Sequence, residues 1–172
     1  AQFGTAAARA KEAGFDGVEI HGGHGYMISG FLSPALNQRD DRYGGSLENR
    51  ARLLTEIIES VRNAVGDDFP LWCKLDSIEY GKTDGITLTD AIEAARLSEK
   101  AGADAITVSA YHDANRGALH SESNIPHVPN RMVSNAAAIK NSLSIPVIAS
   151  GRIEPDSAEN HIASGQYDFL GM

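Results

Sequence analysis

The 172-residue sequence has a single cysteine, no run of basic residues and no long apolar segment. One cysteine excludes a disulfide within the chain and favours a cytoplasmic location. A net charge of −8 argues against nucleic acid or an anionic membrane as a partner of the surface as a whole. No apolar run approaches the roughly 20 residues of a membrane span, and no signal-peptide pattern is present. The remaining composition is ordinary for a soluble globular protein, with 42% hydrophobic and 22% charged residues.

The most informative segment covers residues 19–26 and reads Glu-Ile-His-Gly-Gly-His-Gly-Tyr. His21, His24 and Tyr26 follow a short apolar strand pattern directly, and the glycines between them allow tight or left-handed turns. Such a loop packs no core, and it presents two imidazoles as hydrogen-bond donors and a phenol as a proton donor. Two alternatives remain at this point. One is a His-x-x-His metal site, although no third ligand is nearby, and the other is a pair of structural histidines.

An internal repeat indicates the fold class. Residues 13–20 (AGFDGVEI) recur as residues 101–108 (AGADAITV) and, more loosely, as residues 164–170 (SGQYDFL). A second unit alternates with the first, at residues 68–75 and 144–150, and in each copy a proline opens a strand after an amphipathic helix. The chain is therefore built from alternating helices and short strands.

The expected elements are five helices and five strands in strict alternation. We expect helices at 2–13, 47–65, 88–101, 134–143 and 155–164, and strands at 16–21, 70–75, 104–109, 145–150 and 167–172. This alternation predicts an α/β protein with a parallel sheet. The repeats favour a (β/α)8 TIM barrel, whose typical size of ~250 residues exceeds this chain. A doubly wound sheet is the alternative, although no Gly-x-Gly-x-x-Gly turn follows the first strand.

The ends of the sequence are unusual for a complete domain. The chain starts inside a helical pattern and stops where an apolar strand is forming. We therefore expect residues 1–172 to form one incomplete barrel domain that is a piece of a longer protein.

Lys74 is isolated within an otherwise apolar strand. It alternates with the apolar residues of segment 70–75, so it should point with His21 into the barrel near the carboxyl ends of the strands, where barrels place active sites. A lysine in such a position needs an anionic partner. It could hold negative charge on a cofactor or intermediate, form a Schiff base as in barrel aldolases, or pair with Asp76 or Glu79.

A short segment after the fourth expected strand predicts phosphate binding. Ser150, Gly151 and Arg152 lie at this strand end and precede a helix that starts near Pro155. Barrels often bind phosphate with backbone N–H groups in their last loops. Gly151 would let a phosphate approach the backbone closely.

Taken together, these motifs resemble the Old Yellow Enzyme family of FMN-dependent ene-reductases, the NADH:flavin oxidoreductases. The segments that carry the resemblance cover essentially the whole chain, at 14–26, 31–34, 37–40, 43–50 and 145–152. The family has a (β/α)8 barrel with FMN at the carboxyl mouth of the strands. The resemblance implies that residues 1–172 span the third helix to the eighth strand, so that the first strands and the C-terminal end of the barrel lie outside the chain.

The resemblance also implies roles for individual residues. His21 and His24 match the pair that holds the carbonyl oxygen of an α,β-unsaturated substrate, and Tyr26 matches the proton donor. Lys74 lies where the family has Arg or Lys against the N1/C2-carbonyl edge of the flavin. Residues 150–152 match the first half of the phosphate site.

The implied activity is the transfer of hydride from NAD(P)H through FMN to an activated alkene of the enone or enoate type. The implied partners are a small-molecule α,β-unsaturated carbonyl substrate and a further copy of the whole protein, with no metal, nucleic acid or membrane. We expect the isolated fragment to be inactive. A Schiff-base aldolase that uses Lys74 and an inactive barrel fragment are the alternatives.

Overall fold

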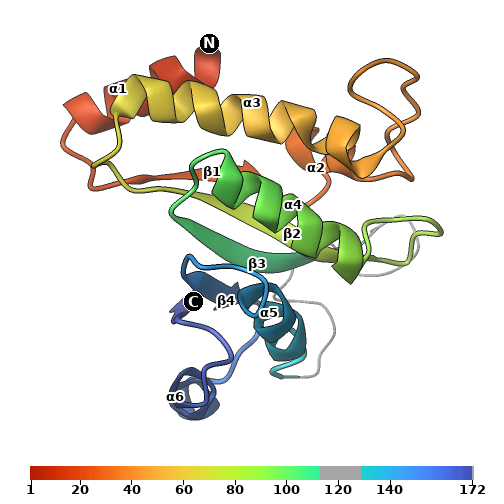
Figure 1. Cartoon of the computed structure of the whole chain (residues 1–172). Coiled ribbons are helices and arrows are strands. Elements are labelled where there is room, and N and C mark those ends of the chain that lie inside the picture. The colour runs from red at the N-terminus through yellow and green to blue at the C-terminus, as the bar shows by residue number, and fades with distance from the viewer. Residues whose placement is uncertain (113–128, 172) are drawn as a thin grey trace.

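The computed structural model describes residues 1–112 and 129–171 and contains one five-stranded parallel sheet (Figure 1). The strands are β1 (Val18–Gly22), β2 (Leu71–Tyr80), β3 (Ala105–His112), β4 (Val147–Ser150) and β5 (Phe169–Gly171). Their spatial order is their sequence order, and every neighbouring pair is parallel. A doubly wound sheet reverses its strand order at a switch point. The described strands show no such reversal, so they have the arrangement of a (β/α)8 barrel.

Helices alternate with the strands. They are α1 (Gln2–Glu12), α2 (Met27–Leu32), α3 (Leu47–Val65), α4 (Leu88–Lys100), α5 (Val133–Lys140) and α6 (Pro155–Ala163). In Figure 1, α1 lies beside α3, and α4 covers the sheet over β2. Within the described ranges, no helix has the length and apolarity needed to span a bilayer.

The long helix α3 begins and ends where the sequence analysis expects it. The hydroxyl of Ser46 accepts a hydrogen bond from the Asn49 N–H at its start, as an N-cap residue does. Gly66 ends the helix at a φ of 79°, a value that favours glycine. Its buried residues recur at helical spacing and face the core.

Two elements differ from the expectation. Helix α2 has no counterpart among the expected helices; its six residues follow the glycine-rich segment directly. Strand β2 continues to Tyr80 instead of ending at Leu75, with a bulge in its pairing to β3 between Asp76 and Glu79. The extension is not apparent from apolar alternation, because three of its five residues, Asp76, Ser77 and Glu79, are polar.

The aspartates of the internal repeat explain why the repeat exists. The Asp104 carboxylate precedes β3 and accepts a hydrogen bond from the N–H of Leu71, the first residue of β2, at 2.8 Å. Asp168 precedes β5 and does the same for Val147, the first residue of β4, at 2.8 Å. Each carboxylate also binds a cation from a helix, with Lys140 paired to Asp168. The repeat therefore fixes the start of one strand against the next.

The two faces of the sheet differ as the alternation predicts. One face packs under the helices and is fully buried, with Leu71, Cys73, Ile106 and Val147 at 0% exposure. Burial, and to a lesser degree the charge of Glu19, raises the pKa of the Cys73 thiol, so this cysteine is an inert core residue. The opposite face lines a cavity and contains the polar side chains.

Candidate functional site

His21, His24 and Tyr26 form one cluster at the carboxyl end of β1. The ring centroids of His21 and His24 are 4.9 Å apart, and those of His21 and Tyr26 are 5.6 Å apart. His21 and Tyr26 are exposed, with Tyr26 at 66%, and His24 is half-buried. His21 also pairs in register with Lys74 on the neighbouring strand. The structure thus brings the three residues together and places Lys74 next to them.

The backbone of His24 has a left-handed conformation, with a φ of 60°, which is uncommon for a residue with a side chain. Its N–H donates a hydrogen bond to Oδ2 of Asp76 at 2.7 Å. Its ring Nε2 lies 2.6 Å from Oγ of Ser109 and 4.0 Å from Oδ1 of Asp76. Backbone and imidazole of His24 are therefore both held by residues of the neighbouring strands.

Two glycines of the motif are required by close approach. A Cβ at Gly23 would lie 2.8 Å from Oδ1 of Asp76. A Cβ at Gly25, where φ is +73°, would lie 2.8 Å from the ring of Tyr111. Such contacts are too short for carbon, so only glycine lets this loop lie against β2 and β3.

Helix α2 is fixed to β2 by two serines and two carboxylates. Ser29 Oγ donates to Oδ2 of Asp76 at 2.9 Å, and Ser33 Oγ donates to Oε2 of Glu79. Both serines have no exposed surface and stand four residues apart, on one face of the helix. The other contacts of Glu79 are with the Ile86 N–H and with Lys82 Nζ, the latter at 3.4 Å. Asp76 and Glu79 thus position the segment that follows His24. The sequence had suggested them as partners of Lys74.

Burial perturbs the acidity of Asp76. Its carboxyl is 2% exposed, and desolvation raises its pKa from 3.8 to about 6 against the opposing charge of His24 and the hydrogen bonds from Ser29 and the His24 backbone. The sequence analysis missed this role of Asp76. The only signal for it was a carboxylate two residues after Lys74 in the same strand.

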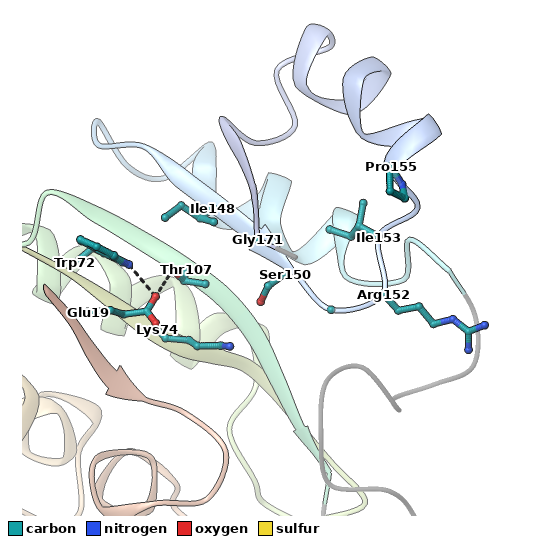
Figure 2. Close-up of a pocket in the computed structure, with 11 residues that line it drawn as sticks. Glu19, Trp72, Lys74, Thr107, Ile148, Ser150, Arg152, Ile153, Pro155 and Gly171 are labelled. Atoms are coloured by element: carbon teal, nitrogen blue, oxygen red, sulfur yellow. Dashed lines mark hydrogen bonds between the residues drawn. The ribbon is translucent and has the colours of Figure 1, made fainter. Parts of the chain in front are cut away.

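A cavity of about 540 Å³ lies on the polar face of the sheet (Figure 2). Its lining residues come from all five strands and the segment after β4; they are Glu19, Trp72, Lys74, Thr107, Ile148, Ser150, Gly151, Arg152, Ile153, Pro155 and Gly171. The cavity brings together Lys74 and the three residues of the expected phosphate segment. In Figure 2 the Arg152 side chain extends away from Lys74.

Glu19 organises the inner part of this cavity, which the sequence analysis did not foresee. Its Oε1 accepts hydrogen bonds from Nε1 of Trp72 at 2.8 Å and from Oγ1 of Thr107 at 2.6 Å. These bonds link β1, β2 and β3 across the cavity face (Figure 2). Glu19 is the first residue of the histidine motif, so the motif contributes to the cavity as well as to the cluster.

The family model described as "NADH:flavin oxidoreductase / NADH oxidase family" matches residues 1–172. The chain belongs to this family.

Relatives agree with this assignment. The chain is 41% identical over 172 residues to an NADPH dehydrogenase of Bacillus subtilis, covering 98% of this chain and 47% of the relative. It is 42% identical to a metal reductase of Desulforamulus reducens, covering 100% of this chain and 25% of the relative. Among solved structures, a 2-naphthoyl-CoA reductase in complex with 2-naphthoyl-CoA superimposes with a TM-score of 0.87 at 34% identity, covering 98% of this chain and 25% of that one. The chain thus spans between about a quarter and a half of these relatives.

The cavity suits the flavin that this family uses. Its volume lies in the ~300–1,000 Å³ range of small-molecule sites, and it contains the cationic group of Lys74. Gly151 and Arg152 have consecutive positive φ values of 101° and 46°, so the backbone turns sharply beside the cavity. The hydroxyl of Ser150 donates to the Val108 carbonyl. A contribution of Ser150 to a phosphate would therefore come from its backbone.

A second concavity, of about 520 Å³, lies beside Tyr26. It is lined by residues of α2 and the following loop, namely Gly25, Tyr26, Met27, Gly30, Phe31, Leu36, Asn37, Gln38 and Arg39. The family motifs in this loop hold it in shape. The Asn37 amide donates to the carbonyls of Phe31 and Tyr43, each at 2.7 Å.

Buried Arg50 closes the same loop onto the helices. Its guanidinium donates to the carbonyls of Leu32 and Gly45 and to the Asp90 carboxylate, at 2.8, 2.6 and 3.0 Å. Arg50 of segment 43–50 thus acts in structure.

Proposed function

We propose that this chain carries the substrate-activating and flavin-binding part of an FMN-dependent oxidoreductase that reduces activated alkenes with electrons from NAD(P)H. The observation that carries the proposal is the cluster of His21, His24 and Tyr26 at the carboxyl end of β1, beside a cavity lined by Lys74. Family membership favours this interpretation of Lys74 over the Schiff-base alternative.

Residues around the cavity would hold the FMN. The ammonium of Lys74 would contact the electron-rich edge of the isoalloxazine, and the backbone of residues 150–152 would bind the phosphate. A bound flavin supplies the two-electron transfer from NAD(P)H to the alkene. The protein then has to orient the substrate and provide a proton.

The histidines and the tyrosine would divide that work. Hydrogen bonds from His21 and His24 to the carbonyl oxygen of an enone or enoate draw electron density from the alkene. The Tyr26 hydroxyl gives its proton to the α-carbon, as a positioned general acid does. Positioned proton transfer of this kind contributes typically about 10²–10⁴-fold to the rate.

The names of the relatives support NAD(P)H as the reductant and a conjugated carbonyl compound as the acceptor. An NADPH dehydrogenase and an NADH oxidase are each 41% identical to this chain, and a naphthoyl thioester is a conjugated carbonyl compound. A conjugated carbonyl acceptor fits the paired imidazoles, because their ring centroids lie 4.9 Å apart and that of Tyr26 lies 5.6 Å from His21.

The substitution Tyr26→Phe tests the assignment in the flavin-loaded whole protein. Stopped-flow absorbance follows flavin reduction by NAD(P)H and then flavin reoxidation by 2-cyclohexen-1-one. We expect unchanged flavin reduction and an alkene step slowed by about 10²–10⁴-fold. Tyr43→Phe is the matched control, since its hydroxyl binds Glu56 on the loop side, and it should change neither step. Equal losses in both steps for Tyr26→Phe would overturn the proton-donor role.

A further inference from the structure

The second concavity, of about 520 Å³ beside Tyr26, is not used by the mechanism above. Large hydrophobic side chains gather around it. Seven such side chains are exposed among the described residues, and three of them, Tyr26, Met27 and Leu36, border this concavity. Single exposed hydrophobic residues are normal on a protein surface, whereas several around one hollow of this size are typical of a ligand site.

The wall of the concavity is held in place by contacts within the loop that follows α2. The Asn37 amide fixes the carbonyls of Phe31 and Tyr43. The guanidinium of Arg39 lies over the rings of the same two residues, at 5.7 and 6.0 Å from their centroids, and forms an ion pair with Asp41. A wall that is ordered before a ligand arrives lowers the entropy cost of binding.

The polar groups of this wall are engaged with the loop itself. The charge of Arg39 is opposed by Asp41, and the Gln38 amide donates to the Pro34 carbonyl at 3.0 Å. The wall therefore offers a ligand mainly aromatic and aliphatic surface. It suits an uncharged aryl or alkyl group, because a phosphate or carboxylate would lose its hydration without gaining equivalent partners.

Tyr26 connects the concavity to the proposed catalytic cluster. Its ring centroid lies 5.6 Å from that of His21, and the same residue borders the concavity together with Gly25 of the histidine motif. A substituent of an acceptor that the histidines hold would therefore reach the concavity along the Tyr26 ring.

We propose that the concavity is the subsite for an apolar aryl or alkyl substituent of the conjugated carbonyl acceptor, and that Gly30 and Leu36 determine which substituents it takes. The inference rests on the proposed function in that His21 and His24 hold the carbonyl oxygen of that acceptor. Gly30 lies within α2 and lines the concavity, and a Cβ at this position would meet no atom within 4 Å. The glycine thus leaves open a space that a larger side chain would fill.

The substitution Gly30→Leu tests this by filling that space. A leucine favours a helix over a glycine, and its Cβ meets no neighbour, so the fold should be preserved. In the flavin-loaded whole protein, stopped-flow absorbance gives the acceptor concentration for half-maximal flavin reoxidation, with benzylideneacetone, which has a phenyl substituent, and with 2-cyclohexen-1-one. We expect the ratio of the first concentration to the second to rise by about 10–200-fold. An unchanged ratio would overturn the proposal.

Leu36→Ala tests the same subsite by removing part of its wall. Leu36 is 46% exposed, so this variant should also fold. The half-maximal concentration of benzylideneacetone should rise by about 3–10-fold, because apolar contact is lost. Ile162→Ala is the matched control, since this side chain on α6 is 40% exposed and lies outside the concavity. No change in Leu36→Ala, or an equal change in Ile162→Ala, would contradict the assignment.

Titration calorimetry of benzylideneacetone with the oxidised, flavin-loaded protein separates binding from turnover. We expect the dissociation constant to rise by about 10–200-fold in Gly30→Leu. If the parent shows this difference from the variant yet reduces no alkene, the proposed function is refuted and the subsite is supported. If the parent reduces both acceptors and binds benzylideneacetone no better than Gly30→Leu does, the proposed function stands and the subsite is refuted.

Discussion

Replacing Asp76 with asparagine should remove a pH-dependent loss of stability from the full chain. Burial raises the pKa of the Asp76 carboxyl from 3.8 to about 6. Between these two values the folded state binds more protons at this group than the unfolded state does. The free energy of unfolding therefore falls as the pH rises through this window, and the loss is complete above it.

The size of the effect follows from the shift. At about 1.36 kcal/mol per pKa unit, the displacement of the Asp76 carboxyl corresponds to about 3 kcal/mol. Solvent screening reduces it little, because the residue is 2% exposed. The amide introduced by Asp76→Asn resembles the neutral carboxyl in shape and never ionises. The variant should therefore lack this pH-dependent loss in the free energy of unfolding.

Urea unfolding measures the difference in the free energy of unfolding between parent and variant, at pH values from about 4 to about 7. The signals are circular dichroism and the fluorescence of the single tryptophan, Trp72. Groups remote from Asp76 titrate alike in both proteins and cancel, so the difference reports the Asp76 carboxyl and the groups in contact with it. Between about pH 4 and about pH 7 we expect the stability of the variant relative to the parent to rise by about 2–2.5 kcal/mol, because a part of the full change lies below pH 4. A constant difference, or a gain by the parent, would show that the Asp76 charge is compensated in the folded state.

Two further predictions concern the loop that follows the site. Arg50→Met should lower the free energy of unfolding by about 3–5 kcal/mol, because it leaves the partners of a buried guanidinium without their hydrogen bonds. Arg42 forms an exposed ion pair, so Arg42→Met should lower it by less than about 1 kcal/mol in the same urea titration. Gly44→Ala should prevent the loop from closing, because its Cβ would overlap the Arg39 carbonyl oxygen. Gly45→Ala meets no atom within 4 Å, so it should cost only the ~1–2 kcal/mol of a positive φ, and similar thermal midpoints for the two glycine variants would contradict this account.

The fold was predictable because the same local hydrogen-bonding requirement recurs along the chain. Asp104 and Asp168 bind the first N–H of the preceding strand, and this requirement leaves the same residue pattern before β3 and β5. Strand alternation predicted that Lys74 lies on the opposite face from the apolar residues of segment 70–75. Lys74 indeed lines the cavity, and Cys73 of that segment is buried under the helices. Each of these inferences uses neighbours in sequence or on one strand.

The site was predictable only in part, because its supports are far apart in sequence. The residues after Leu75 are polar and suggested a loop, yet Asp76 and Ser77 lie buried in β2. They can be buried because Ser29 donates to Asp76, and because Ser77 donates to the Ser109 carbonyl. Hydrophobic periodicity contains no information on such polar pairs, which form only when the strands and α2 come together.

These polar pairs also determine how the site is held. Helix α2 has only six residues and no side-chain cap at its start, so its own hydrogen bonds cannot fix its position. Ser29 and Ser33 tie it to two carboxylates of β2, and Tyr26 is the residue from which it begins. The same Asp76 oxygen that receives Ser29 also receives the His24 N–H. The relative positions of the imidazole and the phenol are therefore set by β2, a strand about 50 residues away in sequence.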